Sequence, residues 1–361
     1  MRALGSIPLW SVVGPLACWL LVPVVILQIG GIFGIILLGA ALVAAVICAV
    51  HHAEVVAHKV GEPFGTLVLA LAVTLIEVAL IVTLMLAGGA ETQSLARDTV
   101  FATIMIILNG LVGLCLLIGG RHFGEQSFSL HGVSAALVTL AAITFLTLVL
   151  PNYTTSVTGP YYSSGQLSFV AVVSLILYAT FIFVQTVRHR DYFLPVDTVH
   201  DEEQHAPPPN NRTTLASTLL LMVTLTAVVV AAKTLAPTVE AAVQAARAPA
   251  TVVGIIIASI ILMPEGYAAV RAARRNRLQT SLNLTLGSAL ASIGLTIPAV
   301  AVISLAFQWP LSLGLASKET LLLALSLFIA ALSLNTGRTT VLQGVVHLVI
   351  FAVYLFIAVV P

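Results

Sequence analysis

The sequence has very little charge. Only 8% of its 361 residues are Asp, Glu, Lys or Arg, whereas soluble domains usually carry about 25%. Apolar residues make up 59% of the chain, and the mean hydropathy is +1.10. This composition excludes an ordinary soluble domain and is typical of a protein that crosses the membrane many times. The net charge of +1 gives no field that would attract nucleic acid, so inorganic ions and membrane lipids are the expected partners.

Cysteine is also scarce. Cys18, Cys48 and Cys115 all lie within apolar runs, at spacings that suit neither a metal site nor a disulfide framework. We interpret them as packing residues. The first apolar run is too long for the core of a signal peptide and has no convincing small-residue cleavage site, so it is interpreted as a retained membrane helix.

Long apolar runs, in contrast, are abundant. Eleven runs approach the roughly 20 residues that a helix needs to cross ~30 Å of hydrocarbon. The predicted fold class is therefore an all-α polytopic membrane protein. The predicted segments are 7–28, 31–53, 63–87, 99–119, 132–151, 166–187, 214–236, 249–271, 279–304, 319–335 and 340–360.

Two glutamates lie deep within these runs. Glu77 is in the third predicted segment and Glu265 is in the eighth. A carboxylate near the bilayer centre costs a few kcal/mol even on lenient insertion scales, so it normally has a function. The two segments are five apart and therefore cross the membrane in opposite directions. If the first segment is extra, the other ten form two inverted five-helix repeats with a glutamate on the second helix of each, as in transporters with a midplane ion site.

One connection is much longer than the others. It reads RHRDYFLPVDTVHDEEQHAPPPNNR and contains clustered acids and three consecutive prolines. We predict that it is an acidic cytoplasmic linker between the two repeats. The predicted parts are an extra helix at 1–30, a first repeat at 31–187, the linker at 188–213 and a second repeat at 214–361.

Basic residues are distributed unevenly between the two sides of the predicted membrane. Cytoplasmic loops carry the excess of Lys and Arg in membrane proteins. With a cytoplasmic N-terminus, eleven of the fifteen basic residues fall on that side, and Arg97, Lys233, Arg247 and Lys318 fall outside. We therefore expect a multi-pass protein of the cell inner membrane with its N-terminus in the cytoplasm and its C-terminus outside.

The residues around the glutamates could supply oxygen atoms to an ion. A proline directly before Glu265 disturbs helix hydrogen bonds and can free carbonyl oxygens. Hydroxyl, amide and carboxylate oxygens suit a hard cation better than a transition metal. Ordinary helix packing is the alternative explanation for the uncharged residues taken singly. The candidate site-lining residues are Thr74, Asn109, Gly110, Gly113, Pro264, Thr285, Gly287, Ser288 and Ser292.

Two clusters of titratable residues are candidates for regulation. The first could sense pH, although a solvated helix end is the alternative reading. The second could bind a regulatory cation, although a flexible acidic linker is the alternative reading. The first cluster is His51, His52, Glu54 and His58, and the second is Asp197, Asp201, Glu202 and Glu203.

Two stretches that end or begin near the glutamates carry a family resemblance. GEPFGTLVLALAVTLIE, at 61–77, resembles the first alpha repeat of the cation/proton exchangers (CAX) in the calcium/cation antiporter superfamily. MPEGYAAVRAARRNRLQTSLNLTLGSALASIGLTIP, at 263–298, is similar to the second repeat. The likeness is especially close to the bacterial ChaA type of sodium, potassium or calcium/proton antiporter. It implies secondary active export of Ca²⁺, Na⁺ or K⁺ in exchange for H⁺ by alternating access, with both glutamates binding proton and cation in turn.

The sequence also departs from this family. Val73 and Thr74 stand where the wider family has Gly-Asn, and Met263 and Pro264 replace the usual small and amide residues. Fewer amide oxygens leave the preference among Ca²⁺, Na⁺ and K⁺ open. A cation channel that uses the same glutamates is the alternative function. An enzyme is not expected, because HExxH, GxSxG and acid-rich diphosphate motifs are absent, and no cofactor is expected.

Overall fold

The computed structural model describes residues 7–60, 64–88, 92–194, 209–245, 249 and 251–360, with side chains described throughout except at 64–71, 87, 88, 240, 243 and 244. Helices dominate these residues. A short antiparallel pairing of β1 (Gln126–Ser127) with β2 (Arg338–Thr339) links two of the connections between helices. The acidic cluster Asp197, Asp201, Glu202 and Glu203 lies outside the described residues, so its regulatory role stays a prediction.

When adjoining helical segments are joined, the described residues contain eleven long helices, and each overlaps one predicted segment. Eight of the described helices are long and apolar enough to cross a membrane. The predicted all-α polytopic fold class is confirmed. The bounds are α1 (Trp10–Ile26), α2 (Gly31–Val60), α3 (Phe64–Gly88), α4 (Leu95–Met105), α5 (Val112–Phe123), α6 (Leu130–Thr144), α7 (Ser164–Phe183), α8 (Asn211–Ala245), α9 (Thr251–Arg274), α10 (Leu278–Ala291), α11 (Ile297–Phe307), α12 (Ser317–Ser333) and α13 (Val341–Val359).

Several of the long helices contain π-helical turns. These turns have an i→i+5 hydrogen-bond pattern, which widens the helix and is frequent at functional sites. The turn η2 joins α4 to α5, and η7 joins α10 to α11, so each of the two helices that follow a glutamate helix is interrupted in this way. The π turns are η2 (Ile106–Leu111), η3 (Phe145–Val149), η5 (Val184–Arg188) and η7 (Ser292–Thr296), and two 3₁₀ turns are η4 (Leu150–Tyr153) and η6 (Arg190–Phe193).

Some helices extend beyond the apolar runs that predicted them. The helix α2 continues to Val60 through the polar stretch that begins at His51, and α8 continues to Ala245 with Pro237 inside it. An apolar run ends where the hydrocarbon would end, whereas a helix ends where its backbone hydrogen bonds can no longer be made. The hydropathy of the sequence therefore fixes the position of these helices better than their length.

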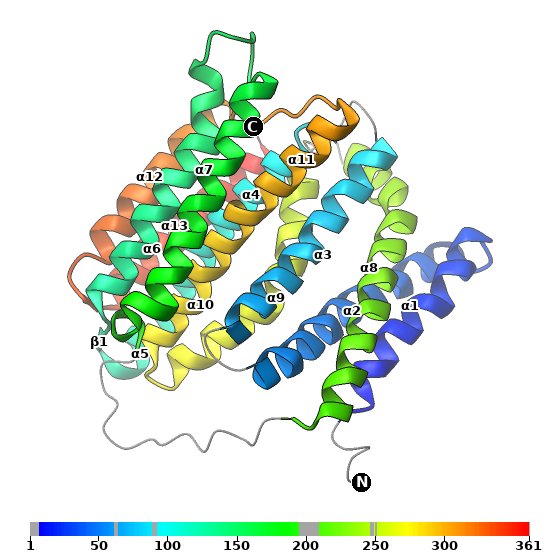
Figure 1. Cartoon of the computed structure of the whole chain (residues 1–361), viewed down its shortest axis with the longest axis horizontal. Helices are drawn as coiled ribbons and strands as arrows, with labels where there is room; N and C mark the ends of the chain where they lie inside the picture. Colours follow the sequence, from blue (N-terminus) through cyan, green and yellow to red (C-terminus); the bar gives the residue numbers. More distant parts are fainter. Residues whose placement is uncertain are drawn as a thin grey trace. The chain divides into compact units, whose positions relative to one another are not determined.

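The chain divides into two compact units. The first unit, Met1–Gly89 with His200–Ala246, contains α1, α2, α3 and α8. Here α1 and α3 each pack against both α2 and α8 (Figure 1). Gly14 allows α1 to approach α2 closely, because a Cβ atom at this position would lie 2.7 Å from the Sγ atom of Cys48. Cys48 is buried, as expected of a packing residue.

The second unit, Ala90–Val199 with Arg247–Pro361, contains the remaining helices. The helix α9 packs against α4, α5 and α10, and α6 packs against α7, α10 and α12 (Figure 1). Cys115 of α5 is buried in a small core with Ala269 and Ala273 of α9. The first unit thus combines α8, from the predicted second repeat, with helices of the first; the predicted repeat boundaries stay a prediction.

Candidate functional site

Glu77 lies on α3 in the first unit. Its side chain is only 2% exposed, and Thr74 is buried as well. Residues three apart lie on the same face of a helix, so the Thr74 hydroxyl and the Glu77 carboxylate are neighbours on α3. Ile76 and Ile81, nearby on the same helix, are almost completely buried. Burying a carboxylate costs free energy, which favours a functional role for Glu77.

Glu265 lies on α9 in the second unit. It is half-buried, and its Oε2 atom is shielded from solvent. Pro264, directly before it, lies inside the helix. Proline has no N–H, so the carbonyl oxygen of Ile260 receives no helix hydrogen bond from position 264. In a regular helix this carbonyl oxygen would accept a hydrogen bond from the residue at position 264. The backbone near Glu265 therefore offers an oxygen atom that could bind an ion.

Two close contacts fix the level of Glu265 within the second unit. A Cβ atom at Gly254 of α9 would lie 2.9 Å from the carbonyl carbon of Asp98, at the start of α4. A Cβ atom at Gly266 would lie 2.9 Å from Cδ2 of Leu111, the last residue of η2. The α4–η2–α5 helix and α9 therefore run side by side in the same direction, with Glu265 level with the end of the π turn.

The other candidates on this helix contact α12 and α13. The Nδ2 atom of Asn109 donates a hydrogen bond of 2.8 Å to the hydroxyl of Ser326 on α12. A Cβ atom at Gly110 would lie 3.3 Å from the ring of Phe351 on α13, and Gly113 also packs closely against α13. The structure thus places Leu111 against α9, and Asn109, Gly110 and Gly113 against the helices on other sides.

The hydroxyl residues that follow Glu265 lie on α10 and at its end. Thr285 is buried, and its hydroxyl donates to the carbonyl oxygen of Ser281 at 3.0 Å. Ser292 is buried at the start of η7, whereas Gly287 and Ser288 are half-buried. Because α10 packs against α9, these residues are near the glutamate helix. In the described part of the chain, no group of three or more His, Cys, Asp or Glu side chains could hold a metal ion.

Two histidines of α2, His51 and His52, face α1, so they are not on a solvated helix end. His52 is completely buried, and its Nε2 atom lies 3.1 Å from the carbonyl oxygen of Ser11. The rings of His51 and Trp10 are 4.8 Å apart. The other members of the predicted cluster are more accessible, since both Glu54 and His58 are exposed.

Two buried polar residues were missed by the sequence reading. Asp98 is 6% exposed and forms an ion pair of 2.8 Å with Arg97, which also donates to the carbonyl oxygen of Gly314. His347 of α13 is completely buried, with its Nε2 atom 2.7 Å from the hydroxyl of Ser333. His347 interrupts an apolar run, so a search for all polar residues within such runs would have found it.

Comparisons with known proteins agree with this arrangement. The model of the family described as sodium/calcium exchanger protein matches residues 30–187 and 216–360. The chain is 47% identical over 364 aligned residues to y4hA of Sinorhizobium fredii (strain NBRC 101917 / NGR234), a proposed ionic transporter, covering 99% of this chain and 98% of that protein. It is 36% identical over 308 residues to the sodium-potassium/proton antiporter ChaA of Escherichia coli (strain K12), covering 85% of this chain and 83% of ChaA.

Solved structures show the same fold. The H⁺/Ca²⁺ exchanger CAX superposes with a TM-score of 0.70 at 18% identity, covering 95% of this chain and 87% of that chain. Native YfkE also has a TM-score of 0.70, at 16% identity, with 95% of this chain and 100% of that chain covered.

Proposed function

Because the chain belongs to the sodium/calcium exchanger protein family, we propose that it is a cation/proton antiporter that exports Na⁺ or Ca²⁺, with K⁺ as a further candidate, in exchange for H⁺. The observation that carries this proposal is the pair of intramembrane carboxylates, Glu77 on α3 and Glu265 on α9, each of which precedes a helix with a π turn. ChaA is a sodium-potassium/proton antiporter and CAX is an H⁺/Ca²⁺ exchanger, which supports these three cations as candidates.

Exchange follows from competition for these carboxylates. In a site with few water molecules a carboxyl group favours its protonated, neutral form, and a cation with enough oxygen ligands displaces the proton. Proton and cation therefore exclude each other. Suppose that the protein switches its site from one side of the membrane to the other only when both glutamates are neutralised. Protons must then bind on one side for the cation to be released on the other. The inward proton gradient then drives cation export.

We assign the oxygen ligands to a small set of residues. On α3 the Thr74 hydroxyl accompanies Glu77, and on α9 the carbonyl oxygen of Ile260 accompanies Glu265. In the same unit as Glu265, the further candidates are the hydroxyls of α10 and η7, which belong to Thr285, Ser288 and Ser292. Calcium takes 6–8 oxygen ligands, and Na⁺ stays a candidate beside it because the sequence has few amide oxygens near the two glutamates. Asn109, Gly110 and Gly113 are instead assigned to packing, because they hold the α4–η2–α5 helix against α12 and α13.

A carrier is favoured over a channel, and a transporter over an enzyme. The glutamates are on equivalent helices of two predicted inverted repeats, which is the arrangement of alternating-access carriers. The chain is a multi-pass membrane protein, and exposed apolar side chains such as Phe169 would contact lipid. The bacterial relatives and the distribution of basic residues support an inner-membrane location with a cytoplasmic N-terminus.

Transport by the purified protein in sealed proteoliposomes tests this function. A cation added outside should release protons from vesicles loaded at acid pH, and an imposed pH gradient should drive Na⁺ or Ca²⁺ uptake against its own gradient. A channel would let the cation move without coupled proton flux, and an enzyme would move neither. Reporter fusions after residue 360 and within 197–210 test the orientation, and they should report opposite sides.

A further inference from the structure

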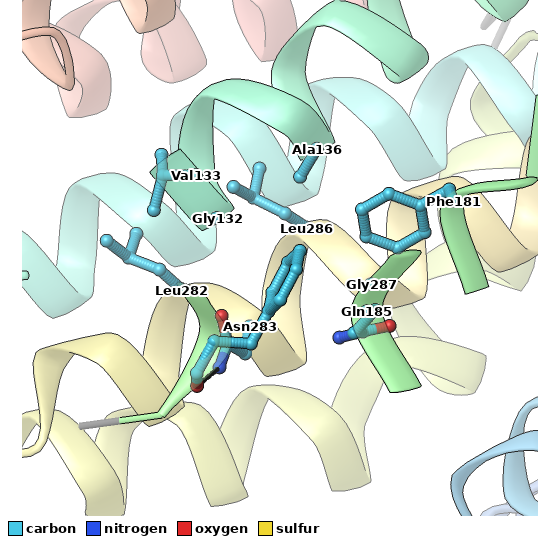
Figure 2. Close-up of a pocket in the computed structure, with 10 residues that line it drawn as sticks. Gly132, Val133, Ala136, Phe181, Gln185, Leu282, Asn283, Leu286 and Gly287 are labelled. Atoms are coloured by element: carbon cyan, nitrogen blue, oxygen red, sulfur yellow. Dashed lines mark hydrogen bonds between the residues drawn. The ribbon is translucent and has the colours of Figure 1, made fainter. Parts of the chain in front are cut away.

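The segment that follows α7 folds back against the second unit. Phe193, at the end of η6, is 8% exposed and lies in a groove lined by α6, α7 and α10. Figure 2 shows Leu282 and Leu286 of α10 and Phe181 of α7 around this groove. The rings of Phe193 and Phe181 meet edge to face, with centroids 5.8 Å apart. This edge-to-face geometry is a favoured one for aromatic pairs and adds to the gain from burial.

A chain of amide groups holds the backbone of the same segment. The backbone N–H of Ser129 donates to Oε1 of Gln279 at 2.6 Å, and Nε2 of Gln279 donates to Oδ1 of Asn283 at 2.9 Å. Nδ2 of Asn283 then donates to the carbonyl oxygen of Phe193 at 2.6 Å. Each amide both accepts and donates, so the orientation of every group in the chain is determined. We call these four residues, Ser129, Gln279, Asn283 and Phe193, the Phe193 clasp.

The residue before Phe193 is also held. The ring of Tyr192 stacks on His189 at 4.7 Å and lies 4.9 Å from His131 of α6. A Cβ atom at Gly132 would lie 2.5 Å from the carbonyl oxygen of Tyr192, so only glycine fits at this close approach. Contacts on both sides of η6 therefore fix it to the start of α6.

The clasp is at the base of the hairpin that carries Glu265. Asn283 and Gln279 belong to α10, which packs against α9. At the turn between the two helices, Nε2 of Gln126 donates to Oδ1 of Asn276 at 2.8 Å. Thr285 and Ser288 follow Asn283 within about one and a half helical turns. Loosening the clasp would thus free the N-terminal half of α10, which leads into the part of the helix that carries these hydroxyls.

Packing alone would not require these amides. Gln279 is 2% exposed, and buried amide groups cost free energy unless every donor and acceptor is satisfied. Apolar residues could fill the same groove without that cost, whereas a hydrogen-bonded chain fixes a single arrangement. The amides therefore contribute orientation in addition to volume.

We propose that Phe193 and Asn283 are positioning residues for cation binding. They hold the start of α10 against α6 and α7, and so keep the hydroxyls of α10 in place beside the α9 helix that carries Glu265. This inference rests on the proposed antiport function. It also gives the segment that leads into the acidic linker a direct attachment to the cation-binding half-site.

Two variants break the clasp in different ways. Asn283→Asp keeps the shape and still accepts from Gln279, but it places an acceptor where the amide donated to Phe193. Phe193→Ala empties the groove, whereas Phe193→Leu keeps much of the apolar volume and should restore near-parental behaviour. Matched controls are Asn210→Asp, which keeps the acceptor for the N–H of Thr213, and Phe183→Ala, which removes an exposed aromatic ring at the end of α7.

The measurements are the cation KM and the maximal exchange rate in proteoliposomes, together with hydrogen–deuterium exchange of 189–194. For Asn283→Asp and Phe193→Ala we expect the KM to rise about tenfold, as for partners that orient metal ligands, with less change in the maximal rate and with faster hydrogen exchange. Faster hydrogen exchange with an unchanged KM would overturn the positioning role, as would unchanged hydrogen exchange in both variants. If the parental protein transports no cation in exchange for protons, the proposed function is overturned instead. Hydrogen–deuterium exchange of 189–194 would still show whether the variants loosen the clasp.

Discussion

The helices that carry Glu77 and Glu265 correspond in the predicted repeats but differ in structure. The helix α3 contains no proline, and its glutamate is almost fully buried. The helix α9 has Pro264 before its glutamate, which is half-buried, and Gly266 after it. The comparison indicates that one half-site holds its carboxylate on a regular helix beside a hydroxyl, whereas the other opens its backbone beside the carboxylate. Although both positions carry a glutamate, we therefore expect Glu77 and Glu265 to be accompanied by different oxygen ligands.

Neutralising either carboxylate should have the largest effect and should remove this difference. We expect Glu77→Gln and Glu265→Gln each to reduce cation-driven proton release to background, because glutamine keeps the volume and cannot exchange a proton for a cation. Glu77→Asp and Glu265→Asp should keep coupled exchange with a raised cation KM, since the carboxylate is one methylene shorter. Dissipation of a pH gradient in everted vesicles measures both results.

Glu125→Gln is the matched control, because this exposed glutamate pairs with Arg338 at the surface. Its exchange rate should equal the parental one at matched expression. Near-parental exchange by either buried glutamine variant would show that coupling does not need both carboxylates.

Restoring a regular helix at Glu265 should sharpen the comparison. In Pro264→Ala, the new N–H can donate to the carbonyl oxygen of Ile260, and a helix-interior proline costs about 3 kcal/mol relative to alanine. We expect a higher Tm and a cation KM raised about tenfold, an effect comparable to that of a lost orienting partner. Thr74→Val, which removes the hydroxyl beside Glu77, should raise the KM without raising the Tm. A Pro264→Ala variant with unchanged KM would remove the Ile260 carbonyl from the ligand set.

The sequence predicted the positions of the helices well, because a helix that crosses the hydrocarbon needs a run of about 20 apolar residues. It also located both glutamates, since charge is rare in apolar runs. The hydrogen bond of Asn109 to α12 had no signal in the sequence, because Asn109 lies within the π turn η2 and no feature of the composition marks such a turn. The burial of His52 was missed for another reason: it depends on α1, and the carbonyl oxygen of Ser11 that His52 contacts is 41 residues away along the chain.

A smaller effect is expected where α9 presses on its neighbour. A Cβ atom at Gly266 would lie 2.9 Å from Cδ2 of Leu111, so Gly266→Ala should displace that side chain and cost about 1 kcal/mol or more of stability. Gly266→Ala should also lower the rate of cation/proton exchange. The double variant Gly266→Ala with Leu111→Ala should recover part of that rate. At the corresponding position of α3, the half-buried Val78 should tolerate alanine with little change. If Gly266→Ala and Val78→Ala lowered the stability and the exchange rate equally, the proposed difference between α9 and α3 would be contradicted.

The smallest effect concerns the contact between α1 and α2 in the first unit. A carbonyl oxygen can only accept, so the Nε2 atom of His52 must donate to Ser11, and the neutral ring then leaves Nδ1 without a proton. Nδ1 is buried and has no hydrogen-bond partner among the described residues. Protonation would therefore bury an N–H group that has no acceptor, so the contact is favoured by the neutral ring and weakens as the pH falls. Among the described side chains, the other charged groups and histidines of α2 and of the helices packed against it are His51, Glu54, His58 and Lys59 on α2, Glu77 on α3, and Arg212 and Lys233 on α8.

Hydrogen–deuterium exchange of the first turns of α1, compared between pH 8 and pH 6 after correction for the intrinsic pH dependence of exchange, measures this effect. We expect lower protection at pH 6, by about 1 kcal/mol or less, the usual net value of one hydrogen bond. His52→Gln retains a donor and has no titration in this range, so it should remove most of the pH dependence. His131→Gln, a substitution on α6 in the second unit, should leave the pH dependence intact. Because neither variant alters Glu77 or Glu265, cation affinity at pH 8 should be parental in both. A pH dependence that persists in His52→Gln would assign it to another group of α2 and would separate the packing of α1 from the state of His52.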